Sequence, residues 1–257
     1  MTEHAARAHA RLSASGAHRW MICTPSVKLE DGIVEQTSRY ALEGTAAHEL
    51  AEIYLQRHFG KISGYQFAKE HHDFTENSSF YNQDMETHVK SYVDFVVSRY
   101  NKMDKPHILL EERLDFSRWV PDGFGTGDVV LIDDGVLEVI DLKYGKGVRV
   151  DALKNTQMML YALGALDTYD IVYDIETVRM TIVQPRLDHI SVYALKLREL
   201  YSWADHMVKP LAKKAHAGEG EYVPGKHCRF CKAKSMCAAW GAYRRKSATE
   251  EFSVITN

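Results

Sequence analysis

Residues 125–145 read GTGDVVLIDDGVLEVIDLKYG, with two alternating apolar runs on either side of the dipeptide Asp134-Gly135. An Asp-Gly pair between two such runs is a strong signal for a β-hairpin with a two-residue turn. The sequence therefore predicts neighbouring antiparallel strands at 126–133 and 136–143.

The turn also fixes the register of the predicted hairpin. If Asp133 pairs with Val136, the numbers of paired residues sum to 269, and Asp128 lies directly opposite Asp141 on the same face. Opposed residues in a hairpin have Cβ atoms about 4.5–5.5 Å apart, so the two carboxylates would repel each other. A divalent cation such as Mg²⁺ or Mn²⁺, which prefers hard oxygen ligands, would remove that repulsion.

Residues around these aspartates are suited to phosphodiester hydrolysis. Lys143 follows Asp141 by two positions, so its side chain emerges on the same face and can orient a water or stabilise charge on phosphorus. Glu138 is three positions away and should face the opposite side of the sheet, which makes it a poor ligand. Gly125 and Gly127 would allow a backbone or a ligand to approach closely.

Five other positions outside the hairpin are candidates for this site. Gln157 and Tyr161 lie four residues apart on a predicted helix, so they share a face that could meet a phosphate or the lysine. His48 is a candidate third metal ligand, because neutral imidazole binds manganese. Glu111 and Glu112 lie on the preceding strand, and the sequence does not decide which of them faces the site.

The remaining elements alternate between helices and strands, which indicates an α/β domain with a mixed sheet. Residues 60–77 are polar and contain Gly and Ser, so we expect a loop there, and we expect a flexible tail at 246–257. Helices are predicted at 44–59, 79–102, 151–167 and 197–217, and further strands at 107–116, 178–184 and 191–196.

All four cysteines fit one metal centre. Cys228, Cys231 and Cys237 form a C-x2-C-x5-C group, and Cys23 lies 205 positions before the first of them. Four thiolates can hold structural zinc or an iron–sulfur cluster. Zinc sites commonly use two short C-x2–4-C pairs, so a group of three plus one remote cysteine disfavours a zinc ribbon.

The amino-acid composition limits the possible partners and location of the chain only broadly. The net charge is −3 and the pI is near 6.5, so any surface that binds nucleic acid must be local. No apolar run approaches the roughly 20 residues of a membrane span, and the first residues lack the apolar core of a signal peptide. We expect a cytoplasmic chain, the host cytoplasm if a phage encodes it, where reduced thiols favour metal binding over disulfides.

Taken together, these residues resemble the RecB-like branch of the PD-(D/E)xK nucleases, and within it the AddB-type members with an iron–sulfur staple. The segments SASGAHRWMICTPS and EGTAAHELAE also resemble an uncharacterised phage and prophage exonuclease family. The matching positions are the family histidine (His48), the second motif (Asp128), the (D/E)-x-K motif (Asp141 and Lys143), the Q-x-x-x-Y motif (Gln157 and Tyr161), and the cysteines of the staple (Cys23, Cys228, Cys231 and Cys237).

The resemblance implies a restriction-endonuclease-like core whose mixed central sheet is flanked by helices. It implies a metal-dependent DNA exonuclease for phage recombination or end processing, with Mg²⁺ or Mn²⁺ held by His48, Asp128, Asp141 and the Leu142 carbonyl. A structural [4Fe–4S] cluster would join the two ends of a single nuclease domain spanning 1–257. Within that domain we distinguish an N-terminal segment (1–43), helices and nuclease core (44–217), a cysteine segment (218–245) and the tail (246–257).

No G-x-x-x-x-G-K-[ST] motif is present, so the chain would act on DNA ends or single strands or with a partner, such as a single-strand annealing or binding protein. Local basic groups suited to DNA are Lys143, Lys146, Arg149, Lys154 and the segment 229–234. Two other hypotheses remain: a non-catalytic DNA- or protein-binding iron–sulfur module, and a zinc-stapled structural protein.

Overall fold

The computed structural model describes residues 10–33, 37–133 and 135–255. Its centre is a five-stranded sheet in the order β1-β2-β3-β4-β5, in which only the β3–β4 pair is parallel. The strands are β1 (His107–Asp115), β2 (Phe124–Asp133), β3 (Gly135–Leu142), β4 (Ile175–Gln184) and β5 (His189–Lys196). The chain is therefore an α/β protein with a mixed sheet, as the sequence predicted.

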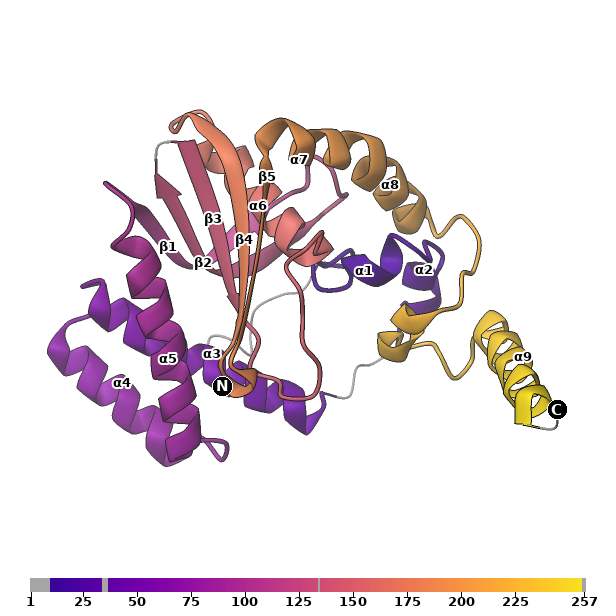
Figure 1. Cartoon of the computed structure of the whole chain (residues 1–257), viewed down its shortest axis with the longest axis horizontal. Coiled ribbons are helices and arrows are strands. Elements are labelled where there is room, and N and C mark those ends of the chain that lie inside the picture. Colours follow the sequence, from indigo (N-terminus) through magenta and orange to yellow (C-terminus); the bar gives the residue numbers. More distant parts are fainter. Residues whose placement is uncertain (1–9, 34–36, 134, 256–257) are drawn as a thin grey trace.

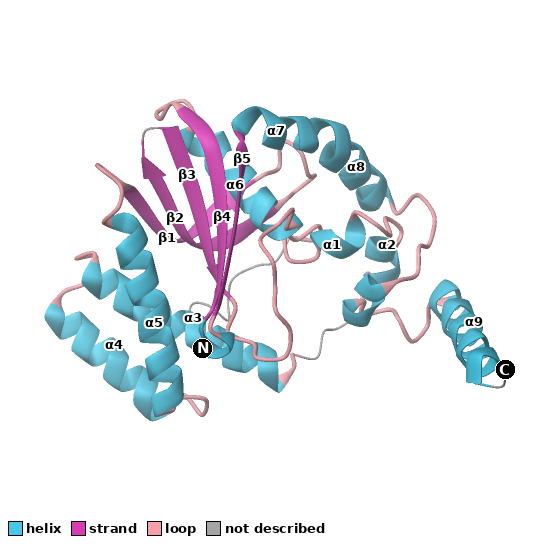
Figure 2. Cartoon of the chain, in the orientation of Figure 1, coloured by secondary structure: helices cyan, strands magenta, loops and turns pink. Residues whose placement is uncertain are grey.

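Helices cover both faces of this sheet (Figures 1 and 2). Those of the described residues are α1 (Ala17–Trp20), α2 (Ser26–Glu30), α3 (Arg39–His58), α4 (Gly64–Asn77), α5 (Gln83–Tyr100), α6 (Thr156–Tyr169), α7 (Leu197–Trp203), α8 (Lys209–Ala217) and α9 (Ala238–Ile255). Short 3-10 turns lie at Pro185–Leu187 and Lys226–Phe230, and a π-helical turn at Ala204–Val208 joins α7 to α8.

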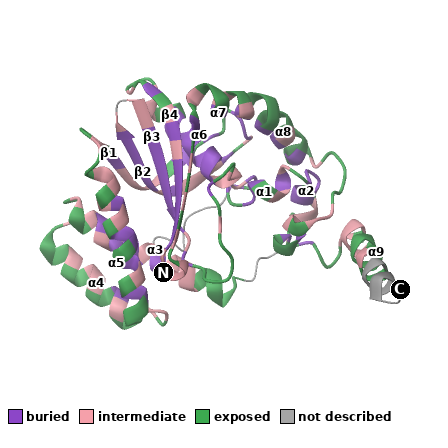
Figure 3. Cartoon of the chain, viewed as in Figure 1, coloured by how far each residue is buried: buried purple, intermediate pink, exposed green. Residues whose placement is uncertain are grey.

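Two apolar cores lie on the two faces of the sheet. One packs α6, α1 and the α7–α8 region against alternate strand residues such as Val130 and Leu137. The other packs α3 and α5 against the intervening residues, such as Leu131 and Ile140. Because both faces are covered, β3 is buried along most of its length and β2 along its second half (Figure 3).

The predicted hairpin register is confirmed. β2 and β3 pair antiparallel from Asp133 with Val136 to Val129 with Ile140, and the residue numbers of each of these pairs sum to 269. Gly135 has a φ of +82°, a left-handed conformation that glycine adopts without strain. The other turn residue, Asp134, lies outside the described residues.

Glu138 faces the opposite side of the sheet from Asp141, as the alternation predicted. Its carboxylate is fully buried on the α5 side. It accepts hydrogen bonds from Arg99 at 2.7 Å, Thr181 at 2.7 Å and Arg179 at 3.3 Å. This buried charge is paired and hydrogen-bonded, so it links α5 to the sheet and takes no part in the candidate site.

The segment predicted as a loop at 60–77 is instead mostly helix α4, so that prediction was wrong. The Ser63 side chain accepts from the backbone N–H of Gln66, and the Gln66 side chain accepts from the backbone N–H of Ser63. This capping box starts a helix despite the polar composition. Of the helix, only Phe74 is buried, and most of its other residues are polar, so the segment resembles a loop in composition.

The C-terminal part also differs from expectation. The single helix predicted at 197–217 is divided by the π-helical turn into α7 and α8. Residues 246–255, expected to be part of a flexible tail, continue helix α9. That helix projects from the rest of the molecule at the end of the chain (Figure 1).

Among the described residues, no helix is both long and apolar enough to cross a membrane.

A polar cluster joins α3, α4 and α5 away from the sheet. The Glu86 carboxylate, 7% exposed, accepts from the Tyr54 hydroxyl, lies 2.9 Å from Lys90 Nζ and lies 3.4 Å from His71 Nε2. Burial opposes its ionisation, but these partners outweigh burial and lower the pKa of Glu86 to about 2. The ionised carboxylate is therefore favoured in the folded state.

We expect Glu86→Gln to lower the free energy of unfolding by about 2 kcal/mol at neutral pH. Because the folded-state pKa lies below the unfolded value of 4.5, this stabilisation is complete above pH 4.5 and disappears as the pH falls toward 2. Urea unfolding of both proteins between pH 7 and pH 2 measures the difference, which should close at acid pH. Glu76→Gln, at an exposed position of α4, is the matched control and should match the parent.

Candidate metal and catalytic site

Three carboxylates lie level with one another on three neighbouring strands. β1 pairs Leu110 with Val129, so Glu111 comes level with Asp128 on β2. The hairpin register in turn brings Asp141 of β3 level with Asp128. The backbone ladders of both strand pairs therefore gather negative charge at one end of the sheet.

His48 of α3 completes a group that could hold a metal ion. One ligand atom from each of His48, Glu111 and Asp128 lies within 4.8 Å of the other two. His48 Nδ1 is 3.2 Å from Asp128 Oδ1. An imidazole and two carboxylates are a donor set that suits manganese or magnesium, so the residues present fit the predicted ion.

The structure distinguishes Glu111 from Glu112. Glu111 is part of the group with His48 and Asp128, whereas Glu112 is not. Glu111 has a φ of +49°, in the left-handed region that residues other than glycine rarely adopt. Such backbone conformations concentrate at functional sites, where the surrounding structure holds them in place.

Lys143 lies between the carboxylates and helix α6. Its Nζ is 2.9 Å from Asp141 Oδ2 and donates to Gln157 Oε1 at 3.3 Å. Gln157 Nε2 donates in turn to the Tyr161 hydroxyl at 3.1 Å. Asn155 caps α6 by accepting from the backbone N–H of Gln157, which fixes the first turn of the helix beside the lysine. The predicted meeting of this helix face with Lys143 is confirmed.

The two glycines before Asp128 have a packing role. A Cβ at Gly125 would stand 2.6 Å from the Tyr161 ring, and a Cβ at Gly127 would stand 2.7 Å from Leu114. The close approach expected at these positions is therefore made by side chains of the chain itself. Glycine at 125 allows Tyr161 to reach Gln157.

Leu142, predicted to offer its carbonyl to the metal, bonds to the site through its N–H. The Leu142 backbone N–H donates to Asp128 Oδ2 at 2.7 Å. Asp128 is therefore held by His48 through one oxygen and by the β3 backbone through the other. Both contacts fix the direction of its carboxylate.

The electrostatics of the site follow from this crowding. Burial disfavours a charged imidazole, but the negative charges of Asp128, Glu111 and Asp141 outweigh burial and raise the pKa of His48 to about 9. Burial likewise disfavours the Asp128 carboxylate, yet the neighbouring His48 charge lowers the pKa of Asp128 overall. Without a metal ion, protonated His48 partly balances the carboxylates.

Asp141 and Lys143 form the second charge pair. Burial, helped by the charge of Asp128, raises the pKa of Asp141 despite the attraction of Lys143. Burial opposes the charged form of Lys143, but Asp141 and the other nearby anionic groups raise the pKa of Lys143 to about 12. Burial also raises the pKa of Tyr161 to about 12, so its hydroxyl stays protonated at neutral pH. Lys143 therefore carries a positive charge at the carboxylates.

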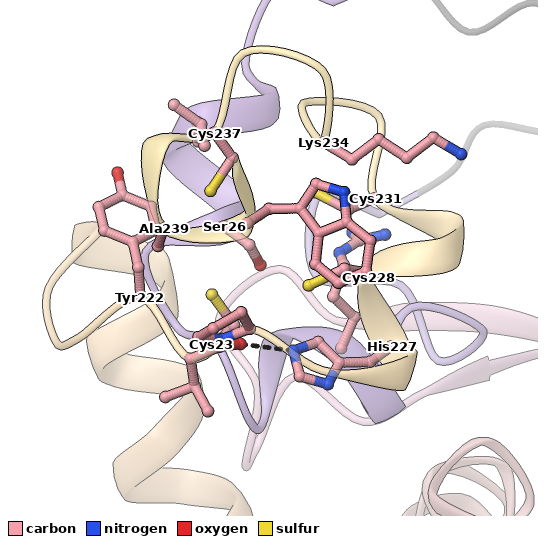
Figure 4. Close-up of a pocket in the computed structure, with 14 residues that line it drawn as sticks. Cys23, Ser26, Tyr222, His227, Cys228, Cys231, Lys234, Cys237 and Ala239 are labelled. Carbon is pink, nitrogen blue, oxygen red and sulfur yellow. Dashed lines mark hydrogen bonds between the residues drawn. The ribbon is translucent and has the colours of Figure 1, made fainter. Parts of the chain in front are cut away.

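The four cysteines line a pocket at the junction of the two chain ends (Figure 4). Cys23 follows α1, while Cys228, Cys231 and Cys237 lie in and after the 3-10 turn before α9. All four are free thiols whose sulfurs face the interior of the pocket in Figure 4. No three of these sulfurs lie within 4.8 Å of one another, in contrast to the ligand atoms at His48.

Polar contacts hold the two chain ends together around this pocket. Glu30 forms an ion pair with Arg19 and accepts from the backbone N–H of Lys232 at 2.6 Å. The Thr24 hydroxyl donates to the Glu219 carbonyl, 195 residues away. These contacts bring the sequence-distant cysteines to one pocket.

Two comparisons place the chain among known proteins. A family model described as "Protein of unknown function (DUF2800)" matches residues 9–257, nearly the whole sequence. Among solved structures, the chain is distantly similar to the crystal structure of SSO0001. That match has 12% identity, covers 87% of this chain and 96% of that chain, and has a TM-score of 0.31.

We expect the chain to bind Mn²⁺ in the absence of DNA, and we expect Glu111→Gln to weaken this binding by at least about tenfold. Substituting a residue that only hydrogen-bonds to a metal ligand already lowers metal affinity by about that factor, so loss of a ligand should lower it at least as much. Isothermal titration calorimetry measures the affinity. Glu112→Gln is the matched control, because it removes the same charge one position away. Equal weakening by both substitutions would show that Glu111 is not a ligand.

Proposed function

This chain belongs to the DUF2800 family, and we propose that it is a divalent-metal-dependent deoxyribonuclease of the PD-(D/E)xK type. The observation that carries the proposal is the position of Lys143. Its ammonium group is held by Asp141 and Gln157 beside the group of His48, Glu111 and Asp128. Metal ligands of this kind beside one fixed cation suit hydrolysis of a phosphodiester.

The residues present fit a metal ion for two reasons. Their donor set consists of an imidazole and carboxylates, and the crowded carboxylates need positive charge. We assign His48, Glu111, Asp128 and Asp141 to this ion. Bound Mg²⁺ or Mn²⁺ would polarise the phosphate and lower the pKa of a coordinated water.

Lys143 acts electrostatically in this proposal. A pKa of about 12 keeps its ammonium group charged at neutral pH, so it is poorly suited to accept a proton. A charged donor at this position can instead stabilise the negative charge that grows on the phosphoryl oxygens. Both roles predicted for the lysine, orienting a water and stabilising charge on phosphorus, are compatible with a charged ammonium group.

Gln157 and Tyr161 position the lysine. Gln157 accepts from Lys143 through its carbonyl oxygen and donates to Tyr161 through its amide nitrogen, so its orientation is fixed at both ends. The protonated Tyr161 hydroxyl retains its own hydrogen to donate. A phosphate that enters beside Lys143 would meet this hydroxyl as a second donor.

We also propose that the four cysteines hold a structural [4Fe–4S] cluster. A tetrahedral zinc ion, with Zn–S bonds of about 2.3 Å, draws its four sulfurs to within about 4 Å of one another. The cysteine sulfurs line one pocket, and no three of them lie within 4.8 Å of one another, so they are not spaced as the ligands of one zinc ion would be. The Gly225 backbone N–H also donates to Cys228 Sγ at 3.4 Å, the kind of bond that tunes iron–sulfur sites.

The nuclease proposal predicts that linear DNA loses its end label in Mg²⁺ or Mn²⁺ and keeps it in EDTA. Asp141→Asn and Lys143→Ala should each reduce cleavage by at least about a hundredfold, because each removes a charge from the reacting centre. Labels placed separately at the 5′ and 3′ ends, on duplex and on single-stranded DNA, would measure polarity and strand preference.

Asp174→Asn is the matched control for the cleavage assay, since it makes the same change at an exposed position just before β4. This variant should cleave as the parent does. The contradicting outcome is that folded parent protein, with its cluster bound, cleaves neither duplex nor single-stranded DNA with either metal. The nuclease proposal would then give way to the alternative of a non-catalytic binding module.

We expect anaerobically purified protein to be brown, and Cys23→Ala to lose the colour and to melt at a lower temperature. The reason is that the cluster would tie Cys23 to cysteines more than 200 residues away, so its loss frees both ends of the chain. Absorbance, iron and zinc analysis, and thermal unfolding measure the two effects. Ile22→Ala, an adjacent residue that is 51% exposed, is the control. A colourless variant that melts like the parent would contradict the structural role.

A further inference from the structure

The C-terminal part of the chain is strongly basic within a mildly acidic protein. Residues 222–249, hereafter the basic segment, contain seven Lys and Arg residues and no Asp or Glu. The remaining residues hold 25 Lys and Arg against 35 Asp and Glu, a net charge of −10. Net positive charge is thus found in about a tenth of the sequence, and the rest of the sequence has a net negative charge.

The charges of the basic segment are displayed to solvent. All seven Lys and Arg side chains are exposed: Lys226, Arg229, Lys232, Lys234, Arg244, Arg245 and Lys246. The last three are consecutive on α9, which projects from the rest of the molecule (Figure 1). The segment therefore presents net positive charge at the surface, which attracts anionic partners.

Exposed apolar side chains lie among these cations. Phe230 and Met236 are each 66% exposed, and the Arg229 guanidinium lies over the Phe230 ring at 5.5 Å. On α9, Trp240 and Tyr243 stack with ring centroids 5.6 Å apart. Cations interleaved with aromatic rings are the combination by which proteins hold single-stranded nucleic acid, phosphates on the cations and bases on the rings.

We propose that the basic segment binds a single strand of the DNA substrate, with Arg244, Arg245 and Lys246 on the phosphates and Phe230 against a base. This inference rests on the proposed nuclease function, which supplies the polyanion. A single strand is favoured over a duplex because the bases of a duplex are already stacked on one another and offer no face to Phe230. The segment is anchored beside the cysteine pocket by the contacts of Lys232 and Phe230 with Glu30 and Arg19.

The test measures binding apart from cleavage. Full-length protein with its cluster is titrated into a fluorescein-labelled oligothymidine strand in EDTA, and anisotropy gives the affinity at several salt concentrations. The triple variant Arg244→Gln, Arg245→Gln, Lys246→Gln should bind roughly tenfold more weakly at about 0.1 M salt. The slope of log affinity against log salt should fall by about 2, since each phosphate contact on a single strand contributes about 0.7.

Two further variants separate charge from stacking. Lys209→Gln, Lys213→Gln, Lys214→Gln removes three exposed cations from α8 and is the matched control, expected to bind as the parent does. Phe230→Ala should weaken binding roughly fivefold or more without changing the salt slope, because base stacking carries no counterion release.

Each outcome decides between definite alternatives. Equal loss of affinity in the α8 and α9 triple variants would overturn the proposal, since it would show a general charge effect. If the α9 variant binds the strand as tightly as the parent does, the proposed role of the basic segment is wrong. This holds even if metal-dependent cleavage shows that the chain is a nuclease. A concentration-dependent dimer that only the α9 variant loses, with no change in binding to the strand, would instead identify the segment as an interface between copies. If the α9 variant binds the strand more weakly and the parent protein cleaves no DNA, the basic segment is a DNA-binding surface and the nuclease proposal is wrong.

Discussion

Crowding of three carboxylates at one end of the sheet is the constraint on which the candidate site depends. Glu111, Asp128 and Asp141 are brought level by backbone pairing, which is indifferent to their charge. Their repulsion must be offset by neighbouring cations, and His48 and Lys143 supply these from the two sides. Burial, with the charge of Asp128 added to it, still raises the pKa of Asp141, whereas His48 lowers the pKa of Asp128. An added divalent cation would offset the repulsion further, which is the physical reason for favouring a metal site here.

A second constraint joins the ends of the chain. Contacts from Thr24 and Glu30 to residues about 200 positions away hold the region of Cys23 against the C-terminal cysteine segment. Each is a single hydrogen bond worth about 1 kcal/mol, and the apolar packing of α1 against the α7–α8 region adds to them. A cluster bound by four thiolates would strengthen the connection between the chain ends considerably. The two proposed metal centres therefore have distinct roles, one in the chemistry and the other in keeping the chain ends together.

Local rules predicted the hairpin and its facing side chains. A two-residue turn permits only one register of the two strands, and the alternation of side chains then decides which face of the sheet each residue occupies. Glu111 was not separable from Glu112, since β1 reaches β2 through residues 116–123 and a long connection fixes no register. Its left-handed backbone gave no sequence signal, because such a φ is usually marked by glycine. Helix α4 was missed for a different reason: its starting signal is a polar capping box, and only one of its residues is buried.

The distribution of charge bears on how the proposed nuclease would hold DNA. A site built from carboxylates repels DNA at a distance, and outside the basic segment the chain has a net charge of −10. Between distant exposed charges, salt screens beyond about 8–10 Å, so attraction must come from cations that contact the phosphates directly. The exposed loop residues Lys146, Arg149 and Lys154, between β3 and α6, offer such contacts beside Lys143. The basic segment would offer further contacts of this kind, so the proposed nuclease would not need a basic overall charge to hold its substrate.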